Sequence, residues 1–200
     1  SEPFSGGAIS IASGEGTTDT SGAIIVKTMN AGVSGVSGML SFTSGTASSG
    51  TSGHFNIFTG SATNGKGGDM LLSIGSGTTK TGGDIVMTAG LSTATSVGTG
   101  GAISVSTGEG ESTSSGALIV ATVNAGTSGV SGALRFTSGT ASSGASGYIQ
   151  IATGSATNGE GGDILVSVGK SKTDPGGDVV VTAGHSEPFS GGAISIASGE

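Results

Sequence analysis

The chain has 200 residues and a net charge of −7, with 43 glycines, three prolines, one tyrosine, and neither cysteine nor tryptophan. Without cysteine it can form no disulfide framework and no thiolate metal site. Its 13 Asp and Glu outnumber its six Lys and Arg, and no stretch reaches the roughly 18 apolar residues of a transmembrane helix. We therefore expect no nucleic-acid partner and no membrane insertion.

Strand-like runs follow one another along the chain, each a short alternation of apolar and polar residues. They begin at Ala8, Ala23, Met39, His54, Asp69, Asp84, Ala102, Ala117, Ala133, Tyr148, Asp163, Asp178 and Ala193. Counted from the first residue of a run, the second and fourth positions are almost always apolar, as Ile24 and Val26 illustrate. Because alternate residues of a strand face one side, we expect these positions to form the core.

The runs recur at steps of 15 or 16 residues, with one step of 18 between Asp84 and Ala102. Residues 5–90 align without a gap to residues 99–184, an offset of 94, and residues 1–15 return identically at 186–200, an offset of 185. Twelve runs therefore make one 185-residue cycle. We divide the chain into a first six-strand block (1–98), a second six-strand block (99–189) and the start of the next block (190–200), within one continuous repeat array that has no separate globular domains. The shared beginning and end suggest a window of a longer array.

The repeats predict an all-β fold: a β-solenoid with about 15 residues per strand–turn unit and one strand per rung. Glycines before most runs, such as Gly22 and Gly53, are expected where the coil turns sharply. The alternative is a three-sided coil with three strands per turn. Every third strand shares its outward character, with Ser10 and Asn56 on one side and Ile25 on another, and this regularity favours the alternative.

Large apolar residues also occupy the third position of six runs, which points away from the expected core. They are Ile25, Leu71, Val86, Ile119, Leu165 and Val180. A soluble monomer seldom leaves such a stripe exposed. The stripe predicts lateral packing of a second rod, and we define these six residues as the candidate assembly surface. Burial of both strand faces within one chain is the alternative.

Four runs begin with an aspartate: Asp69, Asp84, Asp163 and Asp178. With one strand per rung, Asp69 would stack on Asp84 at about 4.8 Å, where two carboxylates repel unless a cation or backbone N–H groups neutralise them. The four residues are therefore weak calcium candidates, although their segments lack the order of calcium-binding nonapeptide repeats. Capping of the preceding Gly-Gly turn by the carboxylate is the alternative.

The sequence holds little that suggests catalysis. Residues 60–67, GSATNGKG, approach a phosphate-binding loop, but Gly67 replaces the hydroxyl residue, no helix is expected after it, and the second copy carries Glu160 in place of Lys66. The two histidines, His54 and His185, are not repeated between the blocks, and no G-x-S-x-G motif occurs. We therefore expect no enzymatic activity, no catalytic residues and no cofactor.

The segments SGGAISIASG, GGDIVMTAG and GGDVVVTAG give the chain a resemblance to Ser, Gly and Thr-rich tandem-repeat surface proteins of microbes and algae. The likeness covers essentially the whole sequence and implies an adhesin or an extracellular fibre subunit. We accordingly expect a structural repeat segment of an extracellular or cell-surface filament that self-assembles by rung stacking and lateral apolar packing. Its expected partners are further copies of the repeat and surface glycans.

Three other functions stay open from the sequence: an adhesin stalk, a calcium-binding solenoid and an ice-binding solenoid. The ice-binding alternative depends on threonines at the fifth position of four runs, Thr43, Thr88, Thr137 and Thr182. Other residue types interrupt this array in the runs between them, whereas a surface that matches a lattice should be uniform along the stack.

Overall fold

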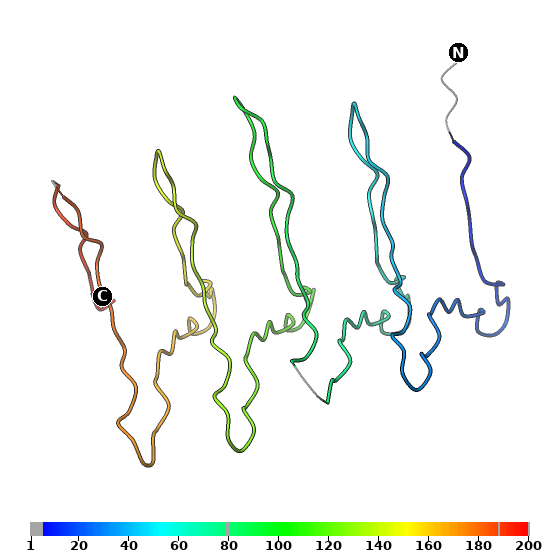
Figure 1. Ribbon diagram of the computed structural model, residues 1–200. Coiled ribbons are helices and arrows are strands. Elements are labelled where there is room, and N and C mark those ends of the chain that lie inside the picture. The colour runs from blue at the N-terminus through cyan, green and yellow to red at the C-terminus, as the bar shows by residue number, and fades with distance from the viewer. Residues whose placement is uncertain (1–5, 79–80, 188, 200) are drawn as a thin grey trace. The chain divides into compact units, whose positions relative to one another are not determined.

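The computed structural model describes residues 6–78, 81–187 and 189–199, so the first five residues of the first predicted block lie outside the described part. The chain separates into two units, Ser1–Ile103 and Ser104–Glu200. Within the described residues neither unit contains a helix or a strand, and extended backbone alternates with turns (Figure 1).

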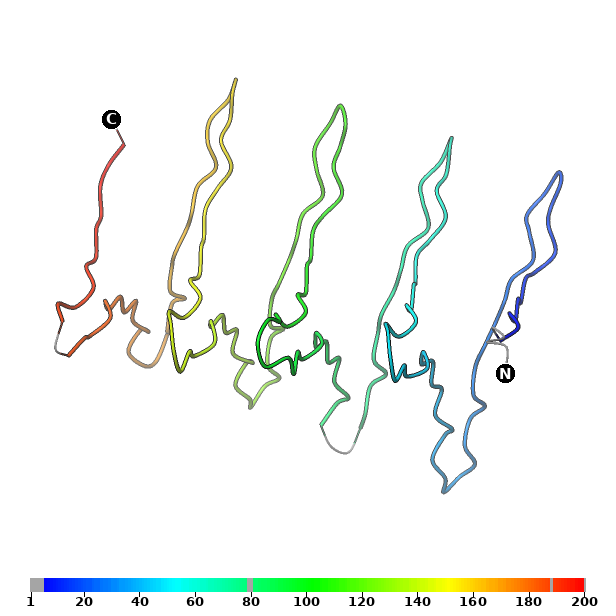
Figure 2. The same ribbon diagram turned by 90° about the horizontal axis from the view of Figure 1, so that it is seen from above.

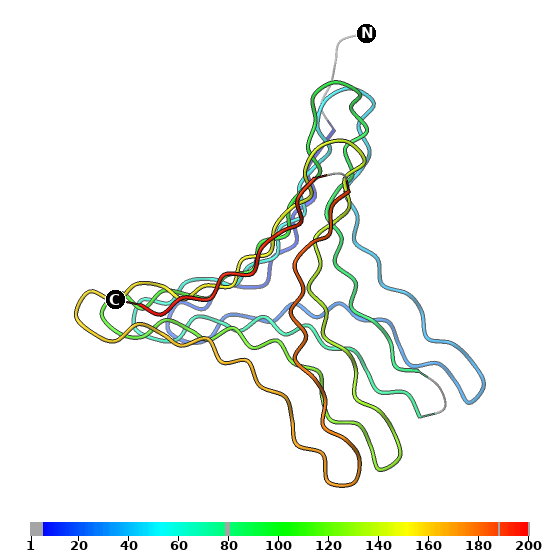
Figure 3. The same cartoon turned by 90° about the vertical axis from the view of Figure 1, so that its left-hand side faces the viewer.

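The extended segments coincide with the predicted runs, and the bends fall in the loops between them. Turns or bends lie at residues 17–19, 33–34, 48–50, 63–65, 78 and 95–97 of the first unit, and at 111–113, 127–128, 142–144, 157–159, 172–174, 187 and 189 of the second. At these turns the chain doubles back, so that two consecutive runs lie side by side as the legs of a narrow hairpin-like loop (Figures 2 and 3). The repeat thus determines where the chain reverses direction.

The glycine directly before each run, from the second run onward, closes the turn, and we call it the turn-closing glycine. A Cβ built on it would lie within 3.7 Å of the side chain of the sixth residue of the preceding run. The pairs are Gly22–Ser13, Gly38–Thr28, Gly53–Ser44, Gly68–Thr59, Gly83–Ile74 and Gly101–Ala89 in the first unit, and Gly116–Thr107, Gly132–Thr122, Gly147–Ser138, Gly162–Thr153, Gly177–Val168 and Gly192–Ala183 in the second. The contact is tight at Gly83 (2.8 Å), Gly177 (3.1 Å) and Gly22 (3.3 Å), where an added Cβ would force the facing side chain to move, and at most of the other positions it is an ordinary van der Waals contact.

This pairing fixes an antiparallel register between consecutive legs. When the sixth residue of one run faces the turn-closing glycine, the fourth residue of that run faces the second residue of the next run. By the same count, the third residues of the two runs face each other. Phe42 and Phe55 agree with this register, since they are the fourth and second residues of consecutive runs and their ring centroids lie 6.4 Å apart. Their planes are inclined by 29°, an offset-stacked arrangement.

Hydrogen bonding does not continue from the turns into the legs. Five backbone–backbone hydrogen bonds form among the described residues, whereas folded proteins form about one hydrogen bond per residue. Four of the five run from the N–H of a turn-closing glycine to the carbonyl of the seventh residue of the preceding run: Gly22 to Gly14 (3.1 Å), Gly101 to Gly90 (2.9 Å), Gly116 to Gly108 (3.1 Å) and Gly192 to Gly184 (2.9 Å). The legs therefore meet at the turn without forming a ladder.

The predicted all-β fold is wrong. The described residues contain neither a β-solenoid with one strand per rung and 12 strands per cycle nor the three-sided coil, because no strand is present. The predicted core at the second and fourth positions is also wrong, since no described residue is buried. The physical reason is the lack of neighbours: two legs joined by a turn are marginally stable as a sheet in water, and stability requires a third strand or a covering layer.

The solvent-accessible surface measures how far the chain is from a compact fold. It amounts to 20137 Å² for 18.6 kDa. A compact monomer of this mass exposes about 8,200 Å² and a fully unfolded chain about 27,000 Å². The chain alone therefore buries only about a third of the surface that a globular protein of its size removes from water.

Candidate assembly surface

The alternation along each run survives as a difference in exposure. Large apolar residues at the second position, apart from Ile9, are 49 to 61% exposed, because the neighbouring leg partly shields them. The six third-position residues of the candidate assembly surface are 78 to 87% exposed. The second positions are thus better shielded than the predicted stripe, whereas the large apolar residues at the fourth position are 57 to 93% exposed and overlap it.

The antiparallel register determines how the six residues of the candidate assembly surface are grouped. The register derived from the glycine contacts pairs the third residues of consecutive runs across a turn, and by this register we match Leu71 with Val86 in the first unit. The same register places Leu165 opposite Val180 in the second unit. The other two, Ile25 and Ile119, have polar residues at the third position of both adjacent runs. Each unit therefore presents one apolar pair and one isolated isoleucine.

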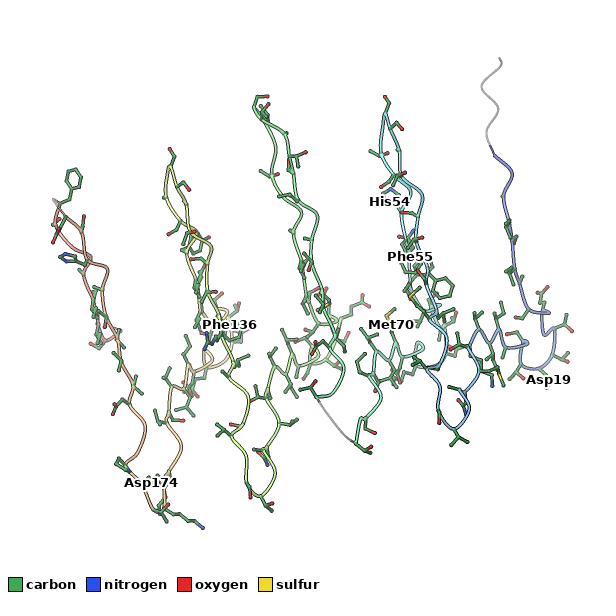
Figure 4. The ribbon with its side chains drawn as sticks, viewed as in Figure 1. Asp19, His54, Phe55, Met70, Phe136 and Asp174 are labelled. Atoms are coloured by element: carbon green, nitrogen blue, oxygen red, sulfur yellow. The ribbon has the colours of Figure 1, made fainter. Side chains whose placement is uncertain are left out.

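The two units present this surface on nearly the same local structure, because the sequence repeats at the offset of 94. They differ in one aromatic contact. Phe42 stacks on Phe55 in the first unit, whereas the second has Phe136 and Ile149 at the same positions. Figure 4 labels Phe55 and Phe136 of these, and shows Asp19 and Asp174 at turns.

The four aspartates proposed as calcium candidates are all exposed. Asp69 pairs with Lys66: the Nζ atom lies 2.7 Å from Oδ1 and 2.8 Å from Oδ2, and both side chains are 77% exposed. By the register drawn from the glycine contacts, Asp69 faces the fifth residue of an adjacent run and not Asp84. In the described residues, no hydrogen bond joins Asp84, Asp163 or Asp178 to the backbone.

Other polar contacts are sparse and lie at the surface. His185 and Glu187 approach to 3.2 Å between Nε2 and Oε1. The part of the chain that the structure describes holds no group of three or more His, Cys, Asp or Glu residues that could bind a metal ion, and no pocket is found there. Calcium binding stays a prediction.

Sequence reasoning missed two features of this surface. The first is the pairing of each turn-closing glycine with the sixth residue of the preceding run, which was detectable as a glycine nine residues after that residue in most repeats. The second is the ion pair of Lys66 with Asp69. Its signal was the spacing of three residues in GKGGD, a segment that was compared with the phosphate-binding pattern and with calcium-binding repeats but not examined for an ion pair.

Comparisons with protein-family models, with curated proteins and with solved structures find no match to this chain. Among the described residues, no helix is long and apolar enough to cross a membrane.

Proposed function

We propose that this chain is a non-enzymatic structural segment of an extracellular or cell-surface filament, in which further copies of the repeat cover its apolar residues. The observation that supports this proposal is the exposure of the large apolar residues: they recur with a period of two in every run, yet none of the described ones is buried. Apolar surface of this extent drives association in water.

The size of the uncovered surface favours a polymer over a dimer. The chain exposes about 12,000 Å² more than a compact monomer of its mass. A standard protein–protein interface buries about 1,600 Å² in total. Covering the excess therefore needs several neighbours around each chain, as in a fibre.

Charge and composition are compatible with repeated self-association. The net charge of −7 makes like copies repel, but at physiological salt this repulsion is screened beyond about 8 Å. The resemblance to Ser, Gly and Thr-rich surface proteins supports an extracellular or cell-surface location. We propose further copies of the chain as the principal partner and surface glycans as a second one.

A six-site variant tests the assembly surface. Threonine replaces Ile25, Leu71, Val86, Ile119, Leu165 and Val180, which removes apolar area and places a β-branched side chain at all six sites. A control variant places threonine at third positions that are already polar: Ser10, Asn56, Ser104 and Gln150. Sedimentation and negative-stain electron microscopy then give the critical concentration for filament formation.

We expect the native chain and the control to form filaments, with salt promoting their assembly. The six-site variant should need a critical concentration more than tenfold higher, since each buried methylene contributes about 0.8 kcal/mol and about 1.4 kcal/mol corresponds to a factor of ten. A native chain that stays monomeric at all concentrations would refute the proposed function. Equal assembly of the six-site variant would instead refute only the choice of surface.

A further inference from the structure

Each unit carries one Asn-Gly dipeptide in the same turn. The turn sequences GSATNG at residues 60–65 and 154–159 are identical, and Asn64–Gly65 and Asn158–Gly159 lie at the bends 63–65 and 157–159. Both dipeptides are exposed. A Cβ built on Gly65 or Gly159 would meet nothing within 4 Å.

The backbone N–H groups of these two glycines are also free of backbone hydrogen bonds within the described residues. An accessible amide nitrogen beside an asparagine side chain can react with it. The glycine nitrogen loses its proton and attacks Cγ of the asparagine, a C–N bond forms, and the bond from Cγ to Nδ2 breaks. Ammonia leaves, and the product is a five-membered succinimide.

Water then opens the succinimide at either of its two carbonyl carbons. One opening gives aspartate, and the other gives isoaspartate, in which the main chain passes through the former side chain. The net reaction consumes one water and releases one ammonia, so no oxidant or co-reactant is required. A residue with a Cβ after the asparagine hinders the attack, whereas glycine does not.

We propose that Asn64 and Asn158 are sites of spontaneous succinimide formation, and that the residue two positions later sets their relative rates. The attacking nitrogen is anionic. Lys66 lies two positions after Asn64, and its ion pair with Asp69 leaves this turn nearly neutral. Glu160 and Asp163 instead give the turn of Asn158 two negative charges. A nearby cation stabilises an anion and nearby carboxylates destabilise it, so Asn64 reacts faster than Asn158.

The proposal is independent of filament formation, and its chemical consequence is a gradual change of charge. Each conversion replaces a neutral amide by a carboxylate and makes the chain more negative than −7. In the second unit the new carboxylate joins Glu160 and Asp163 in one turn.

The test uses the purified full chain, incubated at mildly alkaline pH and sampled over time. Peptide mapping by mass spectrometry measures the replacement of NH by O at each asparagine, and an isoaspartyl methyltransferase labels isoaspartate. Asn30 and Asn124, each followed by alanine, and Asn56, followed by isoleucine, serve as internal controls. The variants are Gly65→Ala, which the open space accommodates, and Lys66→Glu.

We expect Asn64 and Asn158 to convert at least several-fold faster than the three controls. Gly65→Ala should reduce conversion at Asn64 to the control rate and leave Asn158 unchanged. Lys66→Glu should slow Asn64 to the rate of Asn158, and added salt should narrow the difference in the native chain. Equal rates at all five asparagines, or a Gly65→Ala variant that reacts like the native chain, would overturn the site. If Asn64 still converts faster than Asn158 in the Lys66→Glu variant, the role of charge is overturned.

Discussion

The turn between the first two runs allows a matched comparison of two glycine substitutions. A Cβ on Gly16 would collide with the carbonyl oxygen of Asp19 and lie 2.8 Å from that of Thr20, whereas a Cβ on Gly14 would meet nothing within 4 Å. Both glycines belong to the turn closed by the hydrogen bond from the Gly22 N–H to the Gly14 carbonyl, at 3.1 Å. Gly16→Ala should therefore open this turn, and Gly14→Ala should leave it closed.

The magnitudes support this expectation. Either substitution lowers the conformational entropy of the unfolded chain by a similar amount, which by itself stabilises the turn by about 0.4–1 kcal/mol. An overpacked methyl costs about 1–3 kcal/mol, and here the atoms that it meets are backbone atoms, which cannot move away by a change of rotamer. The closing hydrogen bond contributes only about 1 kcal/mol net, so the steric cost is decisive.

Amide hydrogen exchange at Gly22 measures the result. A hydrogen bond worth about 1 kcal/mol slows exchange of the Gly22 N–H roughly fivefold. Gly16→Ala should abolish this protection. The Gly116 N–H, bonded to Gly108 at 3.1 Å in the equivalent turn of the second unit, is an internal reference that neither substitution should change. Identical Gly22 exchange rates in the native chain and both variants would refute the reasoning.

Three further predictions follow from the geometry. Gly83→Ala should shift the methyl resonances of Ile74, because the new Cβ would lie 2.8 Å from Cγ2 of Ile74. Gly82→Ala should leave these resonances unchanged, since its Cβ would meet nothing within 4 Å. Equal shifts in the two variants would contradict the register. Lys66→Gln should cost at most about 0.5 kcal/mol, since the ion pair is 77% exposed, and a change in the far-ultraviolet circular dichroism spectrum would contradict this weak role. The dilute native chain should show a coil spectrum and a radius of gyration by small-angle scattering well above the roughly 16 Å of a compact 200-residue domain; a value near 16 Å would contradict the open structure.

The sequence predicted the turns better than the fold. Glycines at fixed intervals, such as Gly53 and Gly68, marked the places where the chain reverses, because small residues permit a close approach of two legs. The residues that face them could not be predicted from residue type. Thr59 faces Gly68 and Ile74 faces Gly83, so polar and apolar residues serve at the same position.

The failure of the fold prediction has a similar cause. Period-two alternation shows which residues share a side of an extended segment, but it does not show whether another segment covers that side. Leu40 and Ile85 have the pattern of core residues, yet both are about half exposed, because each leg has its neighbour only across a turn. The candidate assembly surface could be defined from the sequence because the definition needed only the side of each run, and its role in assembly stays a prediction.

Two equivalent turns of unequal length show how the repeat accommodates insertions. The hydrogen bond from Gly192 to Gly184 closes a turn over a step of 8 residues, and that from Gly101 to Gly90 closes one over a step of 11, both at 2.9 Å. Lengthening a loop by this ratio costs only about 0.3 kcal/mol of closure entropy. The same pair of glycines can therefore anchor a grafted peptide. An epitope or enzyme-recognition tag inserted between Gly90 and Gly101 would be displayed without moving the runs on either side. This turn is thus a suitable attachment point for engineering the repeat as a material.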